Sequence, residues 1–172
     1  QVSGGLTFSS NFESGNIGLV RSITPLEVEV TVRPDTNNTR YRLWYYFSVS
    51  GTTQHQRLIF HITNMSKSKS SYREGMSPLV RSSSRPAWQR LPETNVFYYR
   101  KEPNKATKKE YVLSFLFEFD RPADTYYFAY SYPYTYTDLQ KYLFALDQRK
   151  GIDWYSRELL CRSVQNRRID LL

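Results

Sequence analysis

The stretch AYSYPYTYTDLQKYL, residues 129–143, constrains the fold of this chain most, because the periodicity of its apolar residues changes there. A dense aromatic run ends in Tyr-Pro-Tyr-Thr-Tyr, and apolar residues at helical spacing follow directly. Before this stretch, apolar and polar residues alternate in many short segments. The sequence therefore predicts an all-β domain over residues 1–136 and the opening of a different domain over residues 137–172.

The all-β domain is predicted from segments with the two-residue period of a strand. Residues 26–32 (LEVEVTV) alternate strictly, with one apolar face and one acidic or polar face. Residues 41–49 and 56–63 are joined by a short link that begins at Gly51, which predicts a hairpin. Short strands with closely spaced turns predict an antiparallel β-sandwich. The other candidate strands are residues 6–8, 17–20, 88–91, 96–100, 111–119 and 125–132.

The second unit is predicted to begin with a helix. Thr137 and Gln140 have the spacing of a capping box, and Gly151 stands where a helix C-cap is expected. One face of this helix is apolar. It carries Leu139, Tyr142, Leu143 and Leu146.

A hairpin is predicted after the helix, from residues 159–164 and 168–172 around a turn at residues 165–167. Residues 153–160 could first form a short helix. The chain stops inside the apolar run 169–172, which would be an exposed edge strand, so we expect a fragment of a longer protein.

Composition narrows the class of protein. The chain has 40% hydrophobic and 23% charged residues, which is typical of globular proteins. Cys161 is its only cysteine, so no disulfide can form within the chain. The formal net charge of +8 favours polyanionic partners such as nucleic acid, anionic lipid or acidic protein tails, and charge alone does not choose between them.

The sequence contains no motif of a self-contained active site. The two histidines, His55 and His61, are six residues apart on one predicted strand, and their side chains should share a face. We interpret them as ordinary strand residues, because one cysteine and two histidines give no zinc-site spacing. Ser-His-Asp, Cys-His and glycine-rich phosphate-loop signatures are also missing from the sequence.

The basic residues fall into three groups, which are either solvated loops or parts of one positive surface for an acidic chain. The first two groups supply our candidate contacts to an acidic substrate: Lys67, Lys69, Arg73, Arg81, Arg85 and Arg90. The third comprises Arg100, Lys101, Lys105, Lys108 and Lys109. Stacking of single-stranded nucleic acid on a basic aromatic sheet is a further alternative, which the alternation of the aromatics with apolar or small residues disfavours.

Tyr132, Tyr134 and Tyr136 alternate around Pro133. Two interpretations stay open for this segment. It is either a packed corner of the core or an interdomain seam, where tyrosine supplies apolar area together with a hydroxyl that needs a partner.

Four stretches give the chain a specific resemblance to the N-terminal domain of the cytosolic carboxypeptidases, a family of zinc metallopeptidases. The stretches are FSSNFESGNIG (8–18), RYRLWYYFSVS (40–50), FHITNMSKSKSSYREGMSPL (60–79) with WQR at 88–90, and FAYSYPYTYTDLQ (128–140). The last departs from the family's usual pattern at Ser131, where a cysteine is common. Residues 82–92, 95–100 and 163–172 look most like the sixth vertebrate-type paralogue.

The resemblance implies an antiparallel β-sandwich packed on an α/β carboxypeptidase domain, of which the helix and hairpin would be the first, truncated part. The zinc-binding His-x-x-Glu motif of the family is absent from this sequence, so no catalytic residue and no metal ligand is assigned in this chain. The fragment should therefore be inactive by itself.

As a full-length protein, a family member with zinc bound would be a cytoplasmic hydrolase that removes glutamates from polyglutamylated tubulin and acidic C-termini. The implied partners are its own catalytic domain and acidic tails, in association with the cytoskeleton, centrioles or cilia, without membrane or nucleic acid. The alternative is an autonomous binding module for acidic tails.

Overall fold

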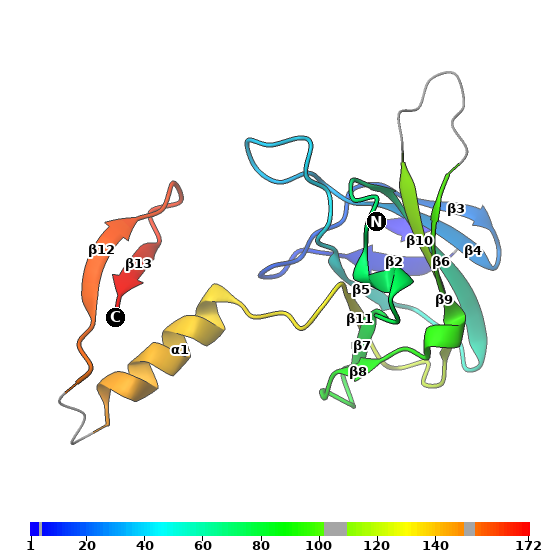
Figure 1. Cartoon of the computed structure of the whole chain (residues 1–172). Helices are drawn as coiled ribbons and strands as arrows, with labels where there is room; N and C mark the ends of the chain where they lie inside the picture. The colour runs from blue at the N-terminus through cyan, green and yellow to red at the C-terminus, as the bar shows by residue number, and fades with distance from the viewer. Residues whose placement is uncertain (4, 102–109, 150–153) are drawn as a thin grey trace. The chain divides into compact units, whose positions relative to one another are not determined.

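The structure, a computed structural model shown in Figure 1, describes residues 1–3, 5–101, 110–149 and 154–172. The chain forms two compact units, Gln1–Pro133 and Tyr134–Leu172. No described helix is long and apolar enough to cross a lipid bilayer.

The described part of the first unit contains a six-stranded and a five-stranded sheet. The six-stranded sheet consists, in spatial order, of β1 (Val2–Ser3), β2 (Leu6–Ser9), β5 (Tyr46–Ser50), β11 (Tyr126–Ala129), β7 (Leu79–Ser82) and β8 (Gln89–Arg90). The five-stranded sheet consists of β3 (Val20–Thr24), β4 (Glu27–Thr31), β6 (Gln56–Met65), β10 (Tyr111–Phe119) and β9 (Val96–Arg100). Two short 3-10 helices connect strands: η1 (Ser71–Arg73) and η2 (Glu93–Asn95).

The core lies between the two sheets and is built from phenylalanines. Phe47 and Phe128 of the six-stranded sheet meet Phe60 of the five-stranded sheet, with ring centroids 5.9 Å and 4.9 Å apart. Phe60 also stacks on Phe115 of the neighbouring strand at 4.9 Å. These rings are almost fully excluded from water, so each contributes apolar area to one continuous core. The predicted all-β sandwich is confirmed.

The predicted hairpin between residues 41–49 and 56–63 is wrong. The strand begins only at Tyr46, and β5 pairs with β2 and β11, whereas β6 pairs with β4 and β10 in the other sheet. Gly51 and His55 adopt positive φ angles of 80° and 59°, and the link between them carries the chain from one sheet to the other. An alternating pattern shows which face of a strand is apolar. It does not show to which sheet the strand belongs, because both sheets have an apolar face towards the core.

Two further details differ from expectation. β4 and β6 run parallel, so the five-stranded sheet is mixed rather than purely antiparallel. β7 lies in a region, residues 73–84, where the sequence shows no clear period, because both of its faces are largely covered by protein.

The second unit consists of α1 (Tyr136–Asp147), β12 (Glu158–Arg162) and β13 (Arg168–Leu171). The helix cap differs from the predicted one. Thr135 is the N-cap residue, and its hydroxyl accepts from the Asp138 amide while the Asp138 carboxylate accepts from the Thr135 amide. Thr137, already inside the helix, cannot form the predicted capping box with Gln140. Gly151, the expected C-cap, lies outside the described residues.

The predicted hairpin of the second unit is confirmed, because β12 and β13 pair antiparallel. Asn166 adopts a positive φ of 59° in the turn between them, a conformation that asparagine tolerates better than most residues. The optional short helix before this hairpin is absent from residues 154–157. On α1, Leu143 is the one buried residue, and Tyr142 is exposed although it belongs to the predicted apolar face.

Candidate functional site

The helix η1 places Tyr72 and Arg73 at one end of the sandwich. Ser70, the N-cap residue, is in an extended conformation, and its hydroxyl accepts from the Tyr72 amide at 3.4 Å. Tyr72 points into the protein and is buried, whereas Arg73 is exposed. A single turn of helix therefore carries one buried, anchoring ring and one exposed cation.

Buried tyrosine hydroxyls hold this turn in place. The Tyr72 hydroxyl donates to the Tyr130 carbonyl at 2.8 Å, so its contact of 2.9 Å with the Tyr45 hydroxyl must be an acceptance from Tyr45. Burial raises the pKa of both hydroxyls; at Tyr72 the hydrogen bond from Tyr45 and, to a smaller extent, the Arg90 charge oppose the increase. Both tyrosines therefore stay neutral over the physiological range and act as fixed hydrogen-bonding groups.

Tyr98 on β9 extends this cluster towards the surface. Its ring stacks between Tyr72 and Tyr111, at centroid distances of 6.3 Å and 5.9 Å. Its hydroxyl donates to the Lys67 carbonyl at 2.5 Å and fixes the loop that carries Lys67 and Lys69. Burial raises the pKa of Tyr98 to about 12.

Two arginines lie over rings of tyrosines: Arg73 over two that are buried, and Arg90 over an exposed one. The Arg73 guanidinium is 5.7 Å from the centroid of Tyr98 and 5.8 Å from that of Tyr111. Arg90, on β8, donates to the Ser77 carbonyl at 3.0 Å and lies 5.6 Å from the centroid of Tyr132. Such cation–π contacts orient a guanidinium without neutralising its charge.

We call this region the basic–aromatic surface: Lys67, Lys69, Arg73, Arg90, Tyr98 and Tyr132. Within the part of the chain that the structure describes, none of its four cations forms an ion pair with a carboxylate. Its charges are therefore available to an anionic partner. Arg100 lies beside it, opposite Tyr111 in the β9–β10 register, whereas Lys105, Lys108 and Lys109 lie outside the described residues.

The other two predicted contact residues are placed differently. Arg81 projects from β7 between the rings of Trp88 and Tyr127, at 4.9 Å and 4.8 Å from their centroids, and it donates to the Tyr46 hydroxyl. It is half-buried, and its Nε is buried without a hydrogen-bond partner among the described groups. Arg81 therefore fastens an aromatic cluster on the outer face of its sheet.

Arg85 is neutralised by Asp120 at 2.6 Å. The Asp120 carboxylate also accepts from the Tyr126 hydroxyl, and these contacts, with that of Tyr126 the largest, lower the pKa of Asp120. An arginine that is already paired in this way has little attraction left for a further anion.

The four seam residues divide between the two units. Tyr132 and Pro133 end the first unit, and Tyr134 and Tyr136 begin the second. Tyr132 and Tyr134 are exposed. The Tyr136 hydroxyl donates to the Arg168 carbonyl at 3.1 Å, and the Arg167 guanidinium lies 5.1 Å from the centroid of its ring. Whether the segment is an interdomain seam stays a prediction.

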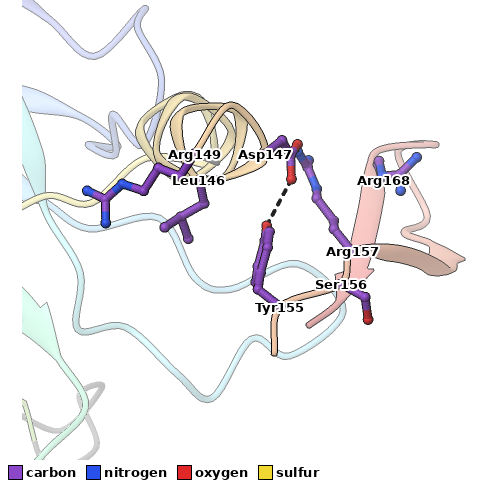
Figure 2. A pocket seen from close by; sticks show the side chains of 7 residues that line it. All are labelled: Leu146, Asp147, Arg149, Tyr155, Ser156, Arg157 and Arg168. Atoms are coloured by element: carbon purple, nitrogen blue, oxygen red, sulfur yellow. Dashed lines mark hydrogen bonds and ion pairs between the residues drawn. The ribbon is translucent and has the colours of Figure 1, made fainter. Parts of the chain in front are cut away.

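The second unit has an open pocket of about 470 Å³, shown in Figure 2. Arg157 crosses it and is nearly buried; its guanidinium contacts Asp147 at 2.8 Å and Asp170 at 3.0 Å, and it also donates to Gln140. The Tyr155 hydroxyl, from the same segment as Arg157, also donates to Asp147, at 3.0 Å. Because these charges satisfy one another, the pocket is best explained as the junction that ties α1 to the hairpin. The lining residues are Leu146, Asp147, Arg149, Tyr155, Ser156, Arg157 and Arg168.

The histidines do not form a metal site. His55 lies just before β6 rather than on it, and its Nδ1 contacts Glu118 at 3.0 Å. The Nδ1 of His61 contacts the Ser114 hydroxyl at 2.7 Å, and its Nε2 is 3.9 Å from Glu27. Among the described residues, no group of three histidine, cysteine, aspartate or glutamate side chains could hold a metal ion. The described residues of this chain therefore do not fit a zinc site.

Sequence reasoning missed two features of these sites. The sequence indicates the tyrosine stack only in part: the two-residue spacing of Val96 and Tyr98 predicts that Tyr98 points inward, but not which rings it contacts. Nothing near Arg157 in the sequence indicates that it contacts Asp170, which lies on the far side of a turn.

Comparisons with known sequences give a consistent result. Residues 8–131 match the family described as cytosolic carboxypeptidase N-terminal domain. The chain is 53% identical over 169 residues to cytosolic carboxypeptidase 6 of Mus musculus, which is 98% of this chain and 31% of that protein. It is 39% identical over 170 residues to cytosolic carboxypeptidase 6 of Caenorhabditis elegans, which is 98% of this chain and 36% of that protein. The chain thus spans about a third of the length of these curated relatives.

Solved structures share the fold. A metallo-carboxypeptidase from Burkholderia cenocepacia matches with a TM-score of 0.68 and 21% identity, over 96% of this chain and 38% of that one. A metallo-carboxypeptidase from Pseudomonas aeruginosa, in complex with (2-guanidinoethylmercapto)succinic acid, matches with a TM-score of 0.68 and 22% identity, over 95% of this chain and 39% of that one.

Proposed function

Because this chain belongs to the cytosolic carboxypeptidase family through its N-terminal domain, we propose that it is the accessory part of a longer metallocarboxypeptidase. The proposed reaction of that longer protein is the removal of glutamates from polyglutamylated tubulin and from acidic protein C-termini in the cytoplasm, where it would associate with the cytoskeleton. In this proposal the first unit recruits the acidic substrate and supports the catalytic domain, and it performs no chemical step.

The observation that carries the recruitment role is the basic–aromatic surface. Four cations without a carboxylate partner among the described residues surround a rigid group of tyrosines. Fixed positive charge accelerates encounter with a polyanion and orients it. A glutamate-rich tail, with one negative charge on each side chain, has the complementary chemistry.

Zinc enters the proposal only through the longer enzyme. A bound zinc ion would activate water for hydrolysis of the terminal peptide bond. Its ligands would come from residues outside this chain, because the described residues provide no suitable group. The residues of this chain would raise the local concentration of the acidic substrate and orient the substrate as it binds.

The proposal is tested by titrating the chain with a glutamate-branched tubulin tail peptide at low and physiological salt. We expect binding that weakens as salt screens the charges, and no comparable binding of single-stranded DNA. The triple variant Lys67→Gln, Arg73→Gln and Arg90→Gln should weaken peptide binding by about tenfold.

The matched control removes three positive charges elsewhere: Arg21→Gln, Arg40→Gln and Arg57→Gln. Arg21 and Arg57 already pair with Glu29 and Glu118, so this variant should retain most of the affinity. Equal losses in the two variants would mean that only net charge matters, and the recruitment role of this surface would be wrong.

An autonomous binding module is the second candidate, favoured by the independent core of the first unit. The two roles separate in the full-length protein. If the triple variant binds acidic peptide poorly but leaves glutamate release unchanged, the surface serves binding alone.

A further inference from the structure

The edge of the five-stranded sheet at β9 is open in the described structure. β9 pairs with β10 on one side and has no strand on its other side (Figure 1). The Lys101 amide donates to the Glu110 carbonyl, which fixes the phase of this antiparallel pair. Phe97 and Tyr99 therefore direct their backbone groups to β10, and Tyr98 and Arg100 direct theirs away from the sheet.

These outward backbone groups have no partner among the described residues. Val96 is the exception, because its amide donates a hydrogen bond to the Glu93 carbonyl at the end of η2. No hydrogen bond is made by the Tyr98 amide, the Tyr98 carbonyl or the Arg100 amide within the described ranges. Proteins often protect such an edge with a proline or a bulge, and neither occurs in β9.

The two sides of this edge differ in chemistry. On the outer face of the sheet, Phe97 is 63% exposed and Tyr99 is 43% exposed, and Leu116 of β10 lies on the same face. On the inner side, Arg73 lies over the ring of Tyr98, and the Lys67 backbone is held by the Tyr98 hydroxyl. The edge therefore has an apolar aromatic side and a cationic side.

We propose that β9 accepts an extended segment of a partner protein as an additional antiparallel strand, and that this segment alternates apolar and acidic side chains. Directly opposed residues of an antiparallel pair place their side chains on the same side of the sheet. Segment residues opposite Phe97 and Tyr99 then meet aromatic rings and should be apolar. The residue opposite Tyr98 points to Arg73 and should be acidic.

This inference goes beyond recruitment of a glutamate-rich tail, because it requires backbone pairing and a two-residue period. Charge attraction needs neither. A strand added in this way gains affinity from main-chain hydrogen bonds and specificity from its alternate side chains.

The test uses the 172-residue chain and the capped peptide Glu-Val-Glu-Val-Glu-Val-Glu. Its composition-matched control is Glu-Glu-Val-Val-Val-Glu-Glu, which has the same charge without the period. We expect the alternating peptide to bind about tenfold more tightly and to shift and protect the amides of Tyr98 and Arg100 in NMR and hydrogen-exchange experiments. Equal affinity of the two peptides would overturn the proposal.

N-methylation of the peptide tests the phase of pairing. Methyl groups on the backbone nitrogens of the two central glutamates should remove donors that face β9 and weaken binding by about tenfold. Methyl groups on the valine nitrogens face away from β9 and should have a small effect. The opposite order, or no difference, would refute strand addition in this register.

Protein variants test the two sides of the edge. Phe97→Ser should weaken binding of the alternating peptide by about threefold. The matched control is Ile23→Ser on β3, an exposed apolar residue at the opposite edge of the same sheet, which should have no effect. If heptaglutamate binds as tightly as the alternating peptide and Phe97→Ser changes neither affinity, strand addition is wrong while charge-based recruitment stands.

Discussion

Removal of the Tyr72 hydroxyl should destabilise the first unit more than any other single-oxygen deletion in the tyrosine cluster. In Tyr72→Phe, the ring keeps its packing, so no cavity forms. The Tyr45 hydroxyl loses its acceptor and the Tyr130 carbonyl loses its donor; the first of these hydrogen bonds is buried and the second is partly buried. A buried group left unsatisfied costs about 1–3 kcal/mol, so we expect about 2–3 kcal/mol in total.

The companion variant Tyr45→Phe should cost less. Tyr72 then keeps its donation to Tyr130 and loses only an accepted hydrogen bond, for which we expect about 1 kcal/mol. Tyr132→Phe is the surface control, because the ring of Tyr132 is exposed and its contact with Arg90 is made by the ring face, which phenylalanine retains; its effect should stay within about 0.5 kcal/mol.

Urea unfolding followed by tryptophan fluorescence gives the free energies. A Trp154→Phe background restricts the signal to Trp44 and Trp88, which both lie in the first unit. The Tyr72→Phe variant should lower Tm by about 4–12 °C with an unchanged m-value. A loss in Tyr45→Phe equal to or larger than that in Tyr72→Phe would refute the assignment of Tyr72 as donor to Tyr130.

The remaining predictions concern titration and two ion-pair networks. The pKa of Tyr98 is raised from 10.0 to about 12, so its contribution to stability is complete below pH 10 and is lost as pH rises towards 12. Alkaline unfolding monitored by tyrosinate absorbance should begin in this window. The Tyr98→Phe variant should lack one late-titrating tyrosine. Asp120→Asn should destabilise the first unit by about 1 kcal/mol in urea unfolding, because the Tyr126 hydroxyl loses a charged acceptor at a partly exposed site. Arg157→Gln should accelerate hydrogen exchange of β13 around Asp170 while leaving the exchange of the first unit unchanged.

The local sequence pattern predicts where strands lie better than it predicts which strands pair with each other. Residues 96–100 and 111–119 are predicted as strands and form β9 and β10 with these bounds, because alternation and aromatic content are local properties. The strand predicted over residues 41–49 is shorter in the structure, where it is β5, and its partner strands could not be read from the sequence. Partner choice depends on which buried faces meet, and this information is distributed over the whole first unit.

The candidate site shows the same limit at the level of single side chains. Arg73 and Arg81 are equivalent candidates in the sequence, since both follow apolar or aromatic residues in a basic region. Their roles differ because Arg73 leaves a one-turn helix and stays exposed, whereas Arg81 leaves the outer face of a strand that Trp88 and Tyr127 cover. The surroundings of each side chain therefore separate these candidates: rings cover Arg81, and Asp120 neutralises Arg85.

The tyrosine cluster bears on the proposed recruitment of an acidic partner. The guanidinium groups of Arg73 and Arg90 are held by ring and backbone contacts, and the Tyr98 hydroxyl fixes the backbone at Lys67, so these groups are oriented before any ligand arrives. Preorganised cations lose less side-chain entropy on binding than lysines and arginines in free loops. In the proposed recruitment of an acidic partner, the tyrosines that hold η1 would therefore also contribute to selectivity. The Tyr98→Phe variant should then reduce affinity for acidic peptides through the released Lys67 loop without altering net charge.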